Sequence, residues 1–237
     1  MIINKKILIF TATYNEKDNI KILVDKVFKN CPGCYLLIVD DNSPDKTSTY
    51  IKLLMKKHKN IFLIQRHSKL GLDTAHKLGF NFAYKNKFDI LITMDADLSH
   101  DPYELNNFIN KLKTNPFVIG SRYMQGGKCL MKKKRLILSK YGNLLIKKVL
   151  QINCNEFTTS YRGFNLRKLK NFNLNIVKSK GYSFMMETIY QLHKKKIKIV
   201  EIPIKFTDRE KGISKIPRIE IIRTLINLFR IKFFNRE

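Results

Sequence analysis

The chain has 237 residues and contains no tryptophan, only six prolines and only four cysteines. Cys31 and Cys34 form one CxxC pair, and no second CxxC or histidine pair follows at the spacing of a zinc site. The Pro-Gly between them is typical of a turn between a helix and a strand. No run of about 18 uncharged apolar residues occurs, which argues against a membrane-spanning helix. The N-terminus enters an apolar segment directly, without the features of a signal peptide.

Acidic residues are also scarce, since 19 Asp and Glu stand against 46 Lys and Arg and give a net charge of +27. Such a charge implies an anionic partner, which is a nucleic acid, a phosphorylated ligand or an anionic membrane. Abundant Lys, Asn and Ile also fit an AT-rich coding sequence, which explains part of the lysine excess. No nucleic-acid-binding motif is present, and we therefore expect no nucleic acid partner.

Short apolar runs alternate with segments of helical periodicity in the first half of the chain. Strands are expected at residues 7–12, 35–39, 61–65, 90–94 and 117–119, and helices at 19–28, 47–57, 71–82 and 103–112. This alternation predicts an α/β fold with a Rossmann-like, doubly wound and mostly parallel sheet.

The second half is more basic. Residues 128–150 and 216–234 place apolar side chains among lysines and arginines, so both are expected to be amphipathic helices. Residues 197–206 alternate as a strand does, and Pro203 within them predicts an edge position or a bulge.

Acidic side chains follow the second and fourth expected strands. Asp40 and Asp41 follow the second strand, and Asp95 and Asp97 follow the fourth. Ligands of open α/β sheets bind outside the carboxyl ends of the strands, so these acids should meet at one crevice. Carboxylates at this spacing suit Mg²⁺ or Mn²⁺ bound to a diphosphate. A solvated loop at 95–97 and a helix cap after Asp41 are the structural alternatives.

Basic residues with hydroxyl neighbours mark a second kind of site. Arg135 and Ser139 are four residues apart and would share one helix face, an arrangement that suits a phosphate monoester, as does Arg122. Arg209 and Lys215 flank a glycine in a segment that we interpret as a lid over phosphates. A solvated basic face is the alternative for each residue taken alone.

Several motifs extend these observations along nearly the whole chain. They are TYNE at 13–16, VDDNSPDKT at 39–47, KLGLDTA at 69–75, MDADLSHDP at 94–102, GSRY at 120–123, EFTTSYR at 156–162, GYSF at 181–184, EIPI at 201–204 and FTDREKGISK at 206–215. In this order the chain resembles the dolichyl-phosphate mannosyltransferases, within the family 2 inverting glycosyltransferases of GT-A fold.

The resemblance implies one GT-A domain over residues 1–237. Its parts would be a nucleotide-sugar-binding half at 1–125, an acceptor-binding half at 126–215 and a C-terminal amphipathic helix at 216–237. The implied nucleotide-sugar residues are Ala12, Tyr14, Glu16, Val39, Asp40, Asp41, Asp95, Ala96, Arg209 and Lys215. The implied acceptor-phosphate residues are Arg122, Arg135 and Ser139, and the implied metal ligands are Asp97 and Ser99, with Mg²⁺ or Mn²⁺ as cofactor.

Catalysis would then rest on Asp95, Asp97 and Arg122 as electrostatic and positioning groups. The implied reaction is inverting transfer of a sugar, with mannose from GDP-mannose as the first expectation, to a polyprenyl or dolichyl phosphate. An ionised phosphate acceptor needs no general base.

We expect the enzyme at the cytoplasmic face of a membrane, with its basic amphipathic segments on the membrane surface and with room for a small membrane subunit. Other hypotheses stay open: UDP-glucose or UDP-GlcNAc as donor, or a saccharide hydroxyl as acceptor, for which Asp95 or Glu156 would serve as base. A basic nucleic-acid-binding protein is the non-enzyme alternative.

Overall fold

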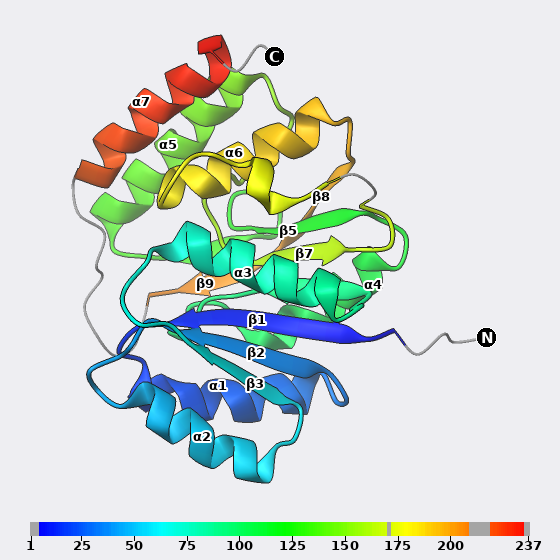
Figure 1. Cartoon of the computed structure of the whole chain (residues 1–237). Coiled ribbons are helices and arrows are strands. Elements are labelled where there is room, and N and C mark those ends of the chain that lie inside the picture. The colour runs from blue at the N-terminus through cyan, green and yellow to red at the C-terminus, as the bar shows by residue number, and fades with distance from the viewer. Residues whose placement is uncertain (1–4, 170–171, 209–218, 235–237) are drawn as a thin grey trace.

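The computed structural model describes residues 5–169, 172–208 and 219–234 (Figure 1). Its elements in chain order are β1 (Ile7–Thr13), α1 (Lys17–Asn30), β2 (Tyr35–Asp40), α2 (Thr47–Lys57), β3 (Ile61–Gln65), α3 (Leu72–Lys85), β4 (Ile90–Thr93), η1 (Pro102–Glu104), α4 (Leu105–Leu112), β5 (Phe117–Ser121), β6 (Lys128–Leu130), α5 (Lys133–Leu150), β7 (Arg162–Asn165), η2 (Leu174–Ile176), α6 (Tyr182–Lys194), β8 (Ile199–Pro203), β9 (Lys205–Thr207) and α7 (Ile219–Phe234). The predicted lid residues Arg209 and Lys215 lie outside the described residues.

A seven-stranded sheet runs through the molecule in the order β3-β2-β1-β4-β7-β5-β8. β1 pairs in parallel with β2 and β4, β2 with β3, and β5 with β8, which confirms the mostly parallel α/β sheet. β7 is antiparallel to both of its neighbours, β4 and β5. The sequence pattern predicts no strand at β7, because its four residues, Arg-Gly-Phe-Asn, contain no apolar run.

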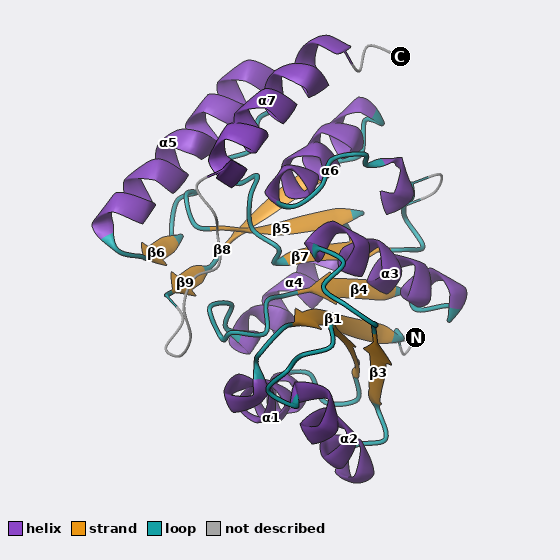
Figure 2. Ribbon diagram, turned by 60° about the vertical axis from the view of Figure 1, so that its left-hand side comes forward, coloured by secondary structure: helices purple, strands orange, loops and turns teal. Residues whose placement is uncertain are grey.

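Helices cover both faces of the sheet, and each face has its own apolar core. α3, α5, α6 and α7 pack on one face, whereas α1, α2 and α4 pack on the other (Figures 1 and 2). Side chains alternate along the strands, so Leu8 and Phe10 of β1 enter the first core and Ile9 enters the second. Polar loops are thereby confined to the ends of the strands.

Two predictions for the second half need correction. Residues 197–206 are not one strand: β8 lies at the edge of the main sheet, and β9 pairs with β6 in a separate two-stranded sheet (Figure 2). The break follows Pro203, which has no N–H group for a ladder, and its predicted edge position is confirmed. Residues 128–150 likewise begin with β6, and only then does helix α5 start at Lys133.

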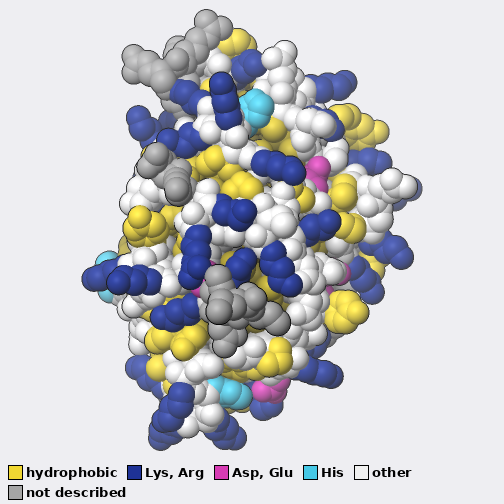
Figure 3. Space-filling model, turned by 90° about the vertical axis from the view of Figure 1, so that its right-hand side faces the viewer, with side chains coloured by type: hydrophobic (Ala, Val, Ile, Leu, Met, Phe, Trp, Pro, Cys, Tyr) yellow, Lys and Arg dark blue, Asp and Glu magenta, His cyan; other side chains and the backbone are white. Residues whose placement is uncertain are grey.

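The α5 and α7 helices lie side by side, and α7 also contacts α6 (Figure 1). Among the described residues, no helix combines the length and apolarity needed to cross a membrane. The positive charge is widely spread, and Figure 3 shows a face of the molecule with many Lys and Arg side chains and few Asp and Glu.

Helix α3 approaches β1 closely at Gly79. A Cβ atom at this position would lie 2.4 Å from Cδ2 of Phe10, whose side chain is fully buried and has no room to move. Glycine is therefore required by packing at this point, despite its unfavourable conformational entropy within a helix.

We predict that Gly79→Ala lowers the free energy of unfolding by about 1–3 kcal/mol, the usual cost of overpacking a core. Gly142→Ala in α5 is the control, because a Cβ there meets nothing within 4 Å. This change should raise stability by about 0.5–1 kcal/mol. Urea unfolding of the three proteins measures both effects, and equal stability of the two variants would contradict the packing argument.

Candidate active site

The loop after β4 carries two carboxylates in a fixed arrangement. Leu98 has φ = +64°, in the left-handed region that few leucines adopt. This turn brings the amide and hydroxyl of Ser99 to Oδ1 of Asp97, at 3.1 and 2.6 Å. Asp97 is 8% exposed, whereas 39% of the Asp95 side chain is exposed. A strained backbone that orients a nearly buried carboxylate is a frequent mark of a functional loop.

The buried side chain of His100 holds the same loop through a hydrogen bond to its backbone. Its Nδ1 accepts a hydrogen bond from the backbone amide of Asp95 at 3.0 Å, so the proton is on Nε2, which lies 3.1 Å from the hydroxyl of Thr159. Burial lowers the pKa of His100, although the nearby acids oppose this effect. We therefore assign a neutral imidazole that positions the loop.

Residues 156–162, called here the 156–162 segment, connect this loop to Arg122 at the other side of the site. The hydroxyl of Ser160 donates to Oδ1 of Asp95, and the hydroxyl of Thr158 accepts from Nη2 of Arg122 at 2.8 Å. One short stretch of chain thus holds groups that come from the ends of β4 and β5.

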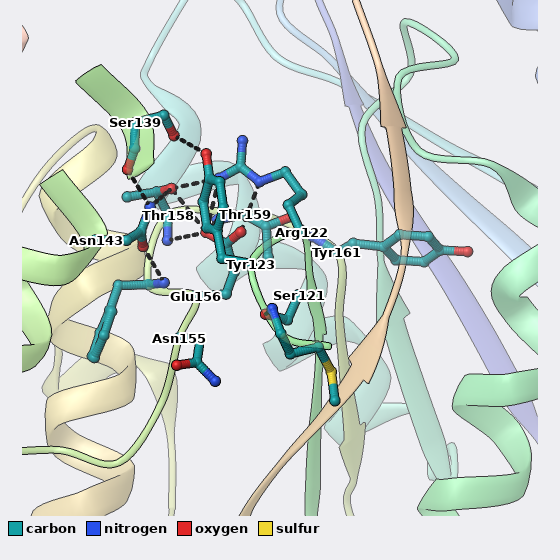
Figure 4. A network of polar contacts seen from close by, with 12 residues as sticks. Ser121, Arg122, Tyr123, Ser139, Asn143, Asn155, Glu156, Thr158, Thr159 and Tyr161 are labelled. Atoms are coloured by element: carbon teal, nitrogen blue, oxygen red, sulfur yellow. Dashed lines mark hydrogen bonds and ion pairs between the residues drawn. The ribbon is translucent and has the colours of Figure 1, made fainter. Parts of the chain in front are cut away.

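Arg122 and Glu156 form a buried ion pair within this network. Nε and Nη2 of Arg122 donate to the two oxygens of Glu156 at 2.7 and 2.8 Å, a bidentate geometry (Figure 4). Burial acts to raise the pKa of Glu156, but Arg122 and Thr158 outweigh it and lower that pKa from its ordinary value. Glu156 is fully buried and ionised, which argues against the hypothesis that it is a general base for a hydroxyl acceptor.

Arg162, the last residue of the 156–162 segment, is a second buried cation and stabilises the segment through hydrogen bonds within it. Arg162 is 1% exposed and donates from Nε and Nη2 to the carbonyls of Thr159 and Phe157, at 2.8 and 2.9 Å. Burial lowers its pKa to about 9. The hydroxyl of Thr93 donates to the carbonyl of Ser160 and ties the segment to β4.

Helix α5 supplies the predicted phosphate residues Arg135 and Ser139. Nη1 of Arg135 donates to Oδ1 of Asp208 at 2.7 Å, and 39% of the arginine side chain is exposed. The hydroxyl of Tyr123 donates to Oγ of Ser139 at 2.7 Å, and burial raises the pKa of this tyrosine to about 12. Both α5 residues face the same space.

A cavity of about 520 Å³ joins these groups. Its polar lining includes six of the predicted site residues: Asp95, Asp97, Ser99, Arg122, Arg135 and Ser139. Its apolar lining comes largely from α5, α6 and α7 and includes Leu138, Leu145, Ile146, Met185, Leu225 and Leu228. The cavity is therefore acidic at the end of β4, basic in the middle and apolar between the helices.

The other predicted nucleotide-sugar residues of the described chain lie outside this cavity lining: Ala12, Tyr14, Glu16, Val39, Asp40, Asp41 and Ala96. Asp40 is fully buried and accepts hydrogen bonds from the hydroxyl of Thr13 and from the amide and hydroxyl of Ser43. Asp41 forms an ion pair with Arg66. The structure thus shows these two acids shaping the loops at the end of β2, and their contact with a nucleoside stays a prediction.

The acids of the cavity have the ligand chemistry of a divalent-cation site. Among the described residues, no three His, Cys, Asp or Glu side chains are grouped to hold a metal ion. Mg²⁺ needs no such group, because it ordinarily takes one or two protein carboxylates and completes its shell with water and phosphate oxygens, and Mn²⁺ shares this preference for oxygen ligands. Asp97 with Asp95 therefore fits a cation that binds together with a diphosphate.

Several residues that hold this site were not predicted from the sequence to have a role in it, namely His100, Thr158, Thr159, Ser160, Arg162 and Asp208. All of them lie within the sequence motifs at 94–102, 156–162 and 206–215, so their positions, but not their roles, could be recognised from the sequence. Apart from those of Arg162, their roles depend on contacts between segments 36 to 73 residues apart, such as that of Thr158 with Arg122 and that of Arg135 with Asp208. No local pattern encodes such contacts.

A mostly parallel sheet with carboxylates and arginines gathered at its strand ends is the architecture expected of a glycosyltransferase of GT-A fold. Residues 8–172 match the family model described as Glycosyl transferase family 2. The chain belongs to this family.

Two relatives match over most of both chains. A polyprenol monophosphomannose synthase from Mycolicibacterium smegmatis is 34% identical over 214 residues, which cover 89% of this chain and 81% of the relative. An undecaprenyl-phosphate mannosyltransferase from Micrococcus luteus is 30% identical over 226 residues, which cover 95% of this chain and 93% of the relative.

Solved structures support the fold. Glucosyl-3-phosphoglycerate synthase from Mycobacterium tuberculosis, in a complex with Mn²⁺, UDP and glucosyl-3-phosphoglycerate, superposes with a TM-score of 0.68 at 14% identity, covering 99% of this chain and 82% of that one. A mannosyltransferase from Pyrobaculum calidifontis, with GDP-mannose and Mn²⁺, gives a TM-score of 0.61 at 17% identity, covering 98% and 65%. At these identities the likeness concerns the fold alone.

We predict that Glu156→Gln lowers the free energy of unfolding by about 3–5 kcal/mol at neutral pH, because it leaves Arg122 buried without its counter-ion. The folded-state pKa of Glu156 is lowered, so its stabilisation is full above the pKa of the unfolded chain and is lost as the pH falls through the folded-state pKa. The difference between wild type and variant should therefore shrink in acid.

Denaturant unfolding between pH 3.5 and 7.5 measures this difference. Glu104→Gln is the matched control, since that carboxylate is partly exposed and accepts from Asn107; its effect should stay within about 0.5 kcal/mol. A Glu156→Gln variant as stable as this control would disprove the importance of the buried pair.

Proposed function

We propose that this glycosyltransferase moves mannose from GDP-mannose to a polyprenyl phosphate, with inversion at the anomeric carbon. One observation carries the proposal: a single cavity combines carboxylates, arginines and a long apolar lining. Those three environments match a nucleotide diphosphate, an acceptor phosphate and an isoprenoid chain. The printed names of both sequence relatives, which are polyprenyl-phosphate mannose enzymes, favour mannose as the sugar.

The acceptor phosphate would lie between Arg122, Arg135 and Ser139. Arg122 is held by Glu156, so it presents a fixed guanidinium edge, whereas Arg135 and Ser139 share one face of α5. The apolar side chains of α5 and α7 beyond them would receive the first isoprene units of the lipid.

The donor would bind along the ends of β1, β2 and β4. Tyr14, Glu16, Asp40 and Asp41 are proposed for the nucleoside, with backbone contacts at Ala12, Val39 and Ala96. Asp95 is proposed for the sugar and ribose, and Arg209 and Lys215, outside the described residues, for the diphosphate. UDP-glucose and UDP-GlcNAc are the alternative donors.

Asp97 would hold Mg²⁺ or Mn²⁺, which would neutralise the diphosphate leaving group. Ser99 donates to Asp97 in this structure and so orients the carboxylate, while direct ligation by Ser99 stays a prediction.

The proposed reaction is one direct displacement. The phosphate oxygen of the acceptor is already ionised near neutral pH, so the residues need only align two anionic substrates and balance their charge. In this scheme Asp95 and Arg122 align the substrates and act on them electrostatically. Neither moves a proton.

Wild-type enzyme should transfer radiolabelled mannose from GDP-mannose into an organic-extractable lipid. We predict that Asp97→Asn lowers kcat at least about 100-fold, because the diphosphate loses its charge balance. Asp101→Asn is the matched control: it lies in the same loop, and its carboxylate accepts from the amide of Tyr103. The control should retain most activity.

UDP-glucose and UDP-GlcNAc in place of GDP-mannose test the choice of sugar. Absence of transfer from every donor, with either metal, would overturn the proposed function. Full activity in Asp97→Asn would overturn only the metal assignment.

We also propose that the enzyme works at the cytoplasmic face of a membrane, alone or with a small membrane subunit. Apolar side chains stand exposed on the paired helices, at Ile137, Leu138, Tyr141 and Leu144 of α5 and Ile222, Ile226, Phe229 and Phe233 of α7. Lysines and arginines of the same helices adjoin them, as in helices that lie at an anionic lipid surface.

Phe229→Glu should weaken binding to vesicles that contain anionic lipid by about tenfold or more, since an exposed aromatic ring that enters the interface is replaced by a charge. Leu53→Glu on α2 is the control, because this leucine is equally exposed, at 51% against 49%, but lies on the other side of the sheet. Vesicle sedimentation measures both, and equal losses would contradict the proposed orientation.

A further inference from the structure

We propose that Asp208 is an exchangeable counter-ion, which holds Arg135 until the acceptor phosphate takes its place. The inference rests on the proposed function, in which Arg135 binds that phosphate. Oδ1 of Asp208 accepts from Nη1 of Arg135 at 2.7 Å, and Oδ2 accepts from the backbone amide of Lys132 at 3.2 Å. Asp208 and Arg135 both line the cavity that contains Asp95 and Asp97.

The two arginines of the proposed acceptor site have counter-ions that differ in burial: Glu156 beside Arg122 is buried, whereas Asp208 beside Arg135 is partly exposed. Glu156 is fully buried and accepts five hydrogen bonds, two from Arg122, two from Thr158 and one from Thr159. Separating this pair would leave two buried charges, so it is a permanent part of the site.

The pair between Arg135 and Asp208 can separate more easily, because both side chains are partly exposed. The side chains of Asp208 and Arg135 are 28% and 39% exposed, so water can solvate either charge when they separate. Partly exposed ion pairs of this kind contribute little net free energy, which makes the exchange inexpensive. Asp208 would keep its hydrogen bond to the amide of Lys132 at the start of α5.

A phosphate monoester has the advantage over Asp208 in this competition. It carries a charge of about −1.5 to −2 near pH 7, against −1 for the carboxylate, and offers three acceptor oxygens to a guanidinium. Ser139 stands one helical turn from Arg135 and accepts from Tyr123, which leaves the serine proton available to the phosphate.

Asp208 would therefore lower the affinity of the site for its acceptor and, by returning to Arg135, would help the lipid product to leave. Removing this competitor should tighten the binding of substrate and product alike. A residue that only stabilised the fold would produce neither effect.

Calorimetric titration with geranyl phosphate, without donor, tests the exchange. Asp208→Asn keeps an oxygen for the amide of Lys132 but loses the charge, and the Kd should fall about two- to fivefold, the range of a partly exposed ion pair. Asp25→Asn is the control: it makes the same change of charge in an exposed pair with Lys21 on α1, and its Kd should not change.

A double-mutant cycle separates exchange from a general gain of positive charge. In the Arg135→Ala background, Asp208→Asn should give no further gain in affinity. A gain that persists there would overturn the proposal, as would unchanged or weaker binding in the Asp208→Asn single variant. In transfer assays with GDP-mannose and the lipid phosphate, the inhibition constant of the lipid product should fall in Asp208→Asn by the same factor as the Kd of geranyl phosphate.

The binding measurement also distinguishes this inference from the proposed function. If mannose transfer occurs but Asp208→Asn leaves the Kd unchanged, only the role of Asp208 falls. If geranyl phosphate binds neither wild type nor variant, the acceptor assignment itself falls, and the role of Asp208 falls with it.

Discussion

The buried pair between Arg122 and Glu156 is the interaction on which both sides of the cavity depend. It anchors the 156–162 segment to β5, and the same segment then holds Asp95 through Ser160 and the acid loop through Thr159 and His100. Asp95, the acid loop and Arg122 thus have a common support. Their separation is set by the length and hydrogen bonding of one short stretch of chain.

The proposed reaction brings two phosphorylated substrates together, and their negative charges repel each other. The network around Arg122 and Glu156 bears on this difficulty, because it holds a positive charge in a fixed place. A net charge of +27 attracts anions to the whole protein, but it cannot place them. Placement requires guanidinium groups with fixed positions, and these require counter-ions of their own. The structure supplies one that is rigid, Glu156, and one that is partly solvated, Asp208.

Most of the fold follows from the sequence, because apolar runs and helical periodicity report burial directly. The strand-end acids Asp95 and Asp97 were predicted for the same reason: they interrupt such a run. β7 was missed, since a central strand that carries Arg162 and Gly163 lacks any apolar signal. The partners of Arg122 were missed too, because a contact across 34 residues leaves no trace in local spacing.

The central position of β7 also has a kinetic consequence. β4 is complete at Thr93, yet its neighbour begins only at Arg162, so during synthesis the edge of β4 stays open for almost 70 residues of chain growth. An open edge is a template for wrong pairing, and non-local pairings form slowly. The antiparallel strand β7, which fills this gap, is continuous with the segment that orients Asp95. The nascent chain therefore can order the loop that carries Asp95 only after helix α5 has been made, and β8 must still be added at the edge of the sheet.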